Sequence, residues 1–105
     1  MKKMRTILHD ILGKNLTPAE VLKGARIEAG ISQEQMSEIT GIKRSNISAL
    51  ENGRIQITAH YAEIFAAVLQ IHPANILYPN GEVFKTKEIL SIEKKAARIL
   101  SSSHR

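Results

Sequence analysis

Apolar residues recur at helical spacing in several separate segments of the chain. In the N-terminal segment they lie three or four residues apart, and Gly13 follows as a residue that can end a helix. This stripe consists of Met4, Ile7, Leu8, Ile11 and Leu12. The spacing predicts an amphipathic helix at the start of the chain.

A second helix is predicted from Thr17 to Gly30. Thr17 can cap its N-terminus, Pro18 occupies the first turn, and Glu20 stands where a capping box places its acidic residue. The apolar inner side of this helix is expected to comprise Val21, Leu22, Ala25 and Ile27.

Two short helices are predicted next, with a tight turn between them. Ser32 and Gln35 form a second capping box, and Gly41 ends the first helix because glycine accepts the positive φ of such a turn without steric cost. The apolar positions of this first helix are Met36 and Ile39. So few residues remain before the next helix that the two must cross steeply rather than run antiparallel.

The second helix of this pair begins near Lys43 and is closed by Asn52-Gly53. At about 100° per residue it has an inner and an outer side. The inner side carries Ile47, Leu50 and Glu51. The outer side carries Ser45, Ser48, Ala49 and Asn52. Because these outer side chains are short and mostly polar, the helix could approach the floor of a DNA major groove.

Three further helices complete the predicted all-α fold. Thr58 can cap the first, His72-Pro73 begins a short second one, and the last runs from about Lys87 to Leu100, with 101–103 as a frayed tail. The apolar face of the first comprises Tyr61, Ile64, Phe65, Val68 and Leu69, and that of the last comprises Ile89, Ile92, Ala96 and Ile99. No segment shows the two-residue alternation of a strand.

Composition narrows the classes of function. The 105 residues suffice for one compact domain with short extensions, and 15 Lys and Arg against 10 Asp and Glu favour a polyanionic partner. Cysteine is absent, the four histidines lack metal-binding spacing, and there is no Gly-rich phosphate loop, so we expect no enzyme activity, no metal and no cofactor. No apolar run is long enough to span a bilayer, so we expect a soluble, cytoplasmic protein.

The segment from Gln33 to Gly53 resembles the helix-turn-helix of the Cro and CI repressor family, which includes Xre-type regulators and many antitoxins. The residues that carry the resemblance are Gln33, Met36, Ser37, Gly41, Ile47 and the terminal Leu50-Glu51-Asn52-Gly53. The resemblance implies a five-helix lambda-repressor-like DNA-binding domain over 17–78. An N-terminal extension (1–16) and a C-terminal extension (79–105) would each add one helix.

The resemblance also implies roles for individual residues. Base contacts are expected from Lys43, Arg44, Ser45 and Ala49, and phosphate contacts from Gln33, Ser48, Asn52 and Arg54. Arg44 is the first choice for a bidentate contact to guanine, because a guanidinium matches O6 and N7. Arg26 and Glu51 are expected to form a structural ion pair. Lys43 departs from the family, which usually has a capping Ser or Thr at this position.

We therefore expect a sequence-specific double-stranded DNA-binding regulator, a homodimer that represses its own operon. The alternative is an antitoxin whose main role is to bind and neutralise a toxin protein. The two terminal apolar stripes could pack within one monomer or be shared between chains, and we expect no membrane partner.

Overall fold

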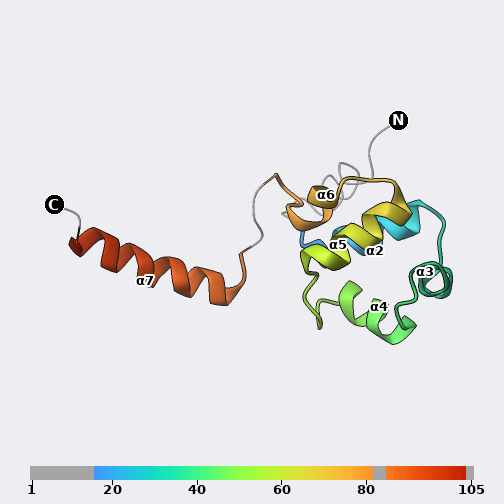
Figure 1. Ribbon diagram of the computed structural model, residues 1–105, viewed down its shortest axis with the longest axis horizontal. Coiled ribbons are helices and arrows are strands. Elements are labelled where there is room, and N and C mark those ends of the chain that lie inside the picture. Colours follow the sequence, from blue (N-terminus) through green and yellow to red (C-terminus); the bar gives the residue numbers. More distant parts are fainter. Residues whose placement is uncertain (1–15, 82–84, 104–105) are drawn as a thin grey trace.

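The computed structural model describes residues 16–81 and 85–103, which form six helices (Figure 1). In chain order these are α2 (Pro18–Glu28), α3 (Gln33–Thr40), α4 (Arg44–Glu51), α5 (Ala59–Leu69), α6 (Pro73–Leu77) and α7 (Lys87–Ser103). Every regular element in these two ranges is a helix, which confirms the all-α prediction. The helix expected over the stripe from Met4 to Leu12 lies outside the described residues.

The predicted capping boxes define where α2 and α3 begin. The Thr17 amide donates to Glu20 Oε1 at 2.8 Å, and the Glu20 amide donates to Thr17 Oγ1 at 3.2 Å. Ser32 and Gln35 make the same reciprocal pair at the start of α3, at 2.9 and 3.0 Å. Each box satisfies two backbone N–H groups that have no partner within the helix, so both starts are set locally.

A short turn fixes the crossing of α3 and α4. Gly41 ends α3 in the left-handed region, with φ 78°, and α4 starts three residues later. Two hydroxyls hold the turn: Ser37 Oγ donates to the Ile42 carbonyl at 2.6 Å, and Thr40 Oγ1 accepts from the Ile42 amide at 3.1 Å. The turn is therefore tied to α3 by side chains as well as by its backbone conformation.

The core lies between α2, α5 and α6 on one side and the α3–α4 pair on the other (Figure 1). Phe65 is the largest fully buried side chain. The buried apolar residues around it are Leu16, Val21, Leu22, Met36, Ile47, Leu50, Ile57, Ala62, Ala66 and Ile76. Because every one of these five helices contributes to the cluster, the position of α4 is coupled to the whole domain.

Two predicted core positions are wrong. Ile27 is 58% exposed and Ile39 is 60% exposed. On α2, Ile27 lies about 140° around the helix from the fully buried Leu22, so it is outside the inner stripe. On α3, Met36 is the one buried residue, because a helix of two turns that crosses its neighbours steeply reaches the core through a single turn.

The buried face of α5 also differs from the prediction. Phe65 is buried as expected, but the other innermost residues are Ala62 and Ala66, while the four remaining large residues of the expected face are half-buried. The alanines lie innermost because their small side chains let neighbouring helices approach α5 closely.

The C-terminal helix α7 stands apart from the five-helix domain (Figure 1). Its side chains are exposed throughout the part that is described, residues 87–101. The helix continues to Ser103, so the expectation of a frayed tail from residue 101 is wrong. The described residues of α7 therefore do not pack into the domain core, so the C-terminal stripe does not enlarge that core.

Candidate nucleic-acid interface

The two sides of α4 have opposite characters. Ile47, Leu50 and Glu51 are buried, whereas Lys43, Arg44 and Ser45 at the N-terminal end are exposed. Ser48 and Ala49, one turn further along the outer side, are half-buried. The residues expected to contact bases thus lie on the accessible side of a helix whose opposite side is sealed into the core.

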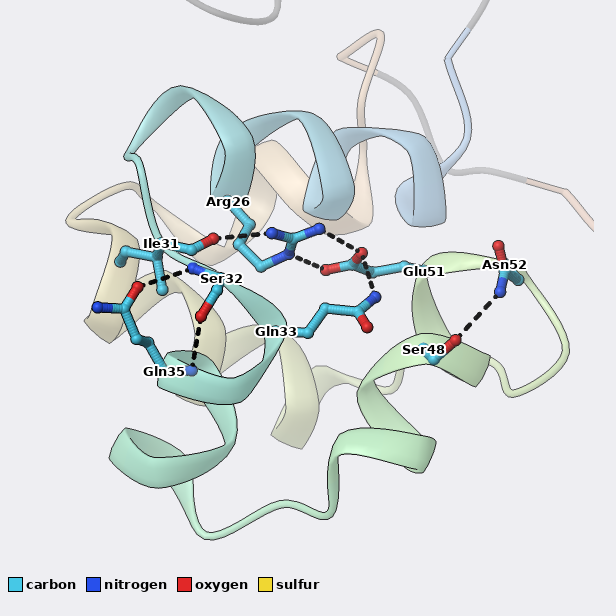
Figure 2. Close-up of polar contacts among 8 residues, drawn as sticks. All are labelled: Arg26, Ile31, Ser32, Gln33, Gln35, Ser48, Glu51 and Asn52. Carbon is cyan, nitrogen blue, oxygen red and sulfur yellow. Dashed lines mark hydrogen bonds and ion pairs between the residues drawn. The ribbon is translucent and has the colours of Figure 1, made fainter.

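The buried carboxylate of Glu51 joins three helices (Figure 2). Arg26 Nε of α2 donates to Glu51 Oε2 at 2.6 Å, and Arg26 Nη2 donates to Oε1 at 3.0 Å. Gln33 Nε2 of α3 donates to the same Oε1 at 3.1 Å. The third donor group of Arg26, Nη1, bonds the Ile31 carbonyl at 2.7 Å.

This cluster compensates a charge that is almost fully removed from water. The Glu51 side chain is 1% exposed and that of Arg26 is 11% exposed. The bidentate pairing and the amide of Gln33 satisfy the carboxylate, and no buried side-chain polar atom of the described residues lacks a partner. The cluster therefore connects the end of α4 to α2 and α3 through buried polar contacts.

Arg44 has a partner that the sequence did not reveal. Its Nη1 donates to Glu34 Oε1 of α3 at 3.1 Å, and both side chains are largely exposed, at 61% and 72%. Glu34 and Arg44 lie ten residues apart, and only the steep crossing of α3 and α4 brings them together. Since an exposed pair is worth at most about 1 kcal/mol, DNA could displace it.

Lys43 is the N-cap residue of α4 and makes no side-chain capping bond. An ammonium group has no lone pair to accept a backbone N–H bond, and a cation at a helix N-terminus opposes the helix dipole. The start of α4 is therefore less well stabilised than the starts of α2 and α3.

The residues expected to hold phosphates lie at two places. Ser48, Asn52 and Arg54 lie at the C-terminal end of α4 and just beyond it, and Asn52 Nδ2 bonds Ser48 Oγ at 3.3 Å (Figure 2). Gln33 lies instead at the start of α3, half-buried and bonded to Glu51. Its bond to Glu51 uses one amide hydrogen, so a second donor and the carbonyl oxygen remain for a DNA contact.

Neither a metal-binding cluster nor a membrane-spanning helix is found among the residues that the structure describes. No three His, Asp or Glu side chains there are placed to hold a metal ion together. Across residues 16–81 and 85–103, none of the helices has the length and apolar character needed to cross a bilayer.

Comparison with known proteins identifies the family. A family model described as helix-turn-helix matches residues 22–76, just over half of the chain. No curated protein matches this chain. Among solved structures, the chain is similar to YmfM of Staphylococcus aureus, described as a candidate DNA-binding membrane protein, with TM-score 0.53 and 24% identity over 69% of this chain and 96% of that one. At this identity the likeness shows a shared fold, while the family match shows membership: the chain belongs to the helix-turn-helix family of Cro/CI and Xre type.

Proposed function

We propose that the protein is a sequence-specific transcriptional regulator that represses its own operon by binding double-stranded DNA with α4. The observation that carries this proposal is the contrast between the two sides of α4. Its inner side is held in the core by the contacts of Glu51 with Arg26 and Gln33. Its outer side carries short side chains, and Lys43 and Arg44 are exposed at its N-terminal end.

This geometry suits a major groove, which is about as wide as one helix. With α4 in the groove, Arg44 would present its guanidinium fork to guanine O6 and N7, and Lys43 and Ser45 would lie at neighbouring base edges. Ala49, one turn on, could offer only apolar contact, for example to a thymine methyl group. Gln33, Ser48, Asn52 and Arg54 would hold the flanking phosphates, which fix register but carry no sequence information.

The protein would act as a homodimer, because one recognition helix covers only a half-site. Regulators of this kind bind two half-sites about one helical turn, roughly 34 Å, apart. We propose that the dimer interface lies near α6 and the chain ends. In this proposal residues 17–78 form the DNA-binding domain, with 1–16 as the N-terminal extension and 79–105 as the C-terminal extension. The proposal places the protein in the cytoplasm with its DNA. The antitoxin role remains a prediction, and a small neighbouring gene that encodes a toxin-like protein would favour it.

Footprinting on the DNA upstream of the gene tests the proposal. Purified protein should protect one or a few sites with two-fold related half-sites, at a concentration well below the one that coats the whole fragment. Cleavage that fades uniformly along the fragment, with no site protected first, would show binding without sequence specificity and would contradict the proposal.

A further inference from the structure

The exposed apolar stripe of α7 has acidic edges. At about 100° per residue, Ile89, Ile92 and Ala96 lie within a narrow sector, with Glu88 and Glu93 on its two edges. Ile89 is 37% exposed and Ile92 is 52% exposed. The lysines and the arginine of α7 lie on other parts of its surface, mainly opposite the stripe. A complementary surface would therefore be apolar with basic edges.

The N-terminal segment of the same chain has this pattern. In the helix that its sequence predicts, the stripe that includes Met4, Leu8 and Ile11 has Arg5 on one edge. Lys14 follows the predicted helix end and stands level with the other edge. A second copy of α7 fits less well, because its acidic edges would meet the acidic edges of the first.

The described residues place the points where the two segments join the domain on one side of it. Asn80 Nδ2 donates to the Leu16 carbonyl at 3.3 Å, so the point where the N-terminal segment joins the domain lies beside the point where the chain leaves for α7. Thr17 and Thr86 also line one hollow of the surface. Thr86 accepts a bond from the Ile89 amide at 3.3 Å, so it marks the start of α7.

We propose that residues 1–12 cover the apolar stripe of α7 in the same chain, as an antiparallel helix pair. The N-terminal segment runs toward the domain and α7 runs away from it, which gives the antiparallel direction. The two stripes match in length, since Met4 to Ile11 and Ile89 to Ala96 each span about 10 Å at 1.5 Å per residue.

A single register satisfies both the apolar and the charged positions. Pairing Ile11 with Ile89, Leu8 with Ile92 and Met4 with Ala96 keeps one constant offset along the two helices. In this register residues 7 and 12 lie directly opposite Glu93 and Glu88, so Arg5 and Lys14 are each two residues, about 3 Å along the axis, from those positions and within reach of them as long side chains. Glu93 already contacts Lys85 at 3.0 Å, an exposed pair that would leave one carboxylate oxygen for Arg5. The proposal is independent of the DNA-binding function.

Because the chain has no cysteine, engineered cysteine pairs test this register directly. The full-length variant Leu8→Cys/Ile92→Cys should oxidise to a product of monomer mass whose yield does not change on dilution, as expected for groups held at high effective concentration. The matched control Leu8→Cys/Lys94→Cys places the second thiol on the opposite side of α7 and should give far less of this product. Ile92 and Lys94 are both exposed, so neither substitution removes a core contact.

Charge reversal supplies a second readout in the Leu8→Cys/Ile92→Cys background. Arg5→Glu should lower the rate of monomer-mass cross-linking about threefold or more, as loss of an exposed ion pair implies, and adding Glu93→Arg should restore it. Lys2→Glu, which makes the same charge change on the far side of the predicted helix, should have little effect. Cross-links mainly of dimer mass, equal rates for the two cysteine pairs, or no cross-link would each overturn the proposal.

Discussion

At the scale of single residues, the Arg26–Glu51 pair is the polar contact on which the position of α4 depends. Removing one partner of a buried pair leaves the other charge uncompensated, which costs about 3 to 5 kcal/mol in fully buried cases. Arg26→Ala should approach this range, because it leaves the almost fully buried Glu51 carboxylate without its partner. Glu51→Ala should lower the free energy of unfolding by less, because the Arg26 guanidinium that it leaves is 11% exposed and keeps its bond to the Ile31 carbonyl. Urea denaturation of each variant gives these values.

A double-mutant cycle separates the pair from its surroundings. The variant Arg26→Ala/Glu51→Ala should lose less stability than the sum of the two single losses, since the second change removes the charge that the first leaves unpaired. Additive losses would show that the two side chains contribute independently, contrary to the role inferred for the cluster. Arg54→Ala, at an exposed position, is the control and should leave stability within about 0.5 kcal/mol.

Glu34 should restrain non-specific binding by holding Arg44. Replacing the carboxylate with an amide in Glu34→Gln removes the ion pair and leaves the Arg44 guanidinium available to any phosphate. We expect affinity for a random duplex to rise more in this variant than in Glu38→Gln, which makes the same charge change at another exposed site of α3. Fluorescence anisotropy at one salt concentration measures these affinities. An equal gain in affinity for the two variants would show that Glu34 acts only through its negative charge and not by holding Arg44.

At the scale of helices, local signals in the sequence predicted most boundaries. The capping boxes at Thr17 and Ser32 and the left-handed Gly41 depend on neighbours within a few residues, so the sequence was sufficient to locate them. The buried face of a helix depends on how it meets the others, which is why Ile27 and Ile39 were misplaced.

Part of the candidate site could not be predicted for the same reason. The contact of Arg44 with Glu34 and that of Gln33 with Glu51 depend on the angle at which helices cross. The capping role of His72, whose Nδ1 accepts from the Ala74 amide at 3.0 Å, was missed because histidine is not among the usual N-cap residues. The ion pair of Arg26 with Glu51, by contrast, was expected from the family resemblance alone.

The uncapped start of α4 leads to a prediction about the whole helix. Lys43→Ser should stabilise the protein by about 1 kcal/mol, because a hydroxyl can accept the backbone N–H bonds that lysine cannot. Lys43→Ala removes the charge without adding a cap and is the matched control. A higher melting temperature for Lys43→Ser than for Lys43→Ala would show that the cap is the cause, and equal values would contradict this account of the helix start.

At the scale of the whole molecule, the proposed dimer sets the spacing of the two recognition helices. Inserting about five base pairs between the operator half-sites turns one half-site by half a helical turn and should abolish binding across both half-sites. Inserting about ten base pairs adds a full turn, so the two half-sites keep their relative orientation. Gel-shift titration against each spacing measures this. Equal affinity for all three spacings, together with a monomeric mass by light scattering with and without operator, would contradict the dimer.

The central claim is that α4 reads bases through Arg44. The most direct measurement is a titration of wild type, Arg44→Ala and Arg54→Ala against the operator and a panel of its single base-pair substitutions. Arg44→Ala should lose discrimination of about 1 to 3 kcal/mol at one symmetric position, while Arg54→Ala should weaken binding to all duplexes alike and lower the salt slope by about one. If Arg44→Ala weakens binding to every duplex equally and keeps the wild-type preference at each position, α4 does not read the sequence through this residue.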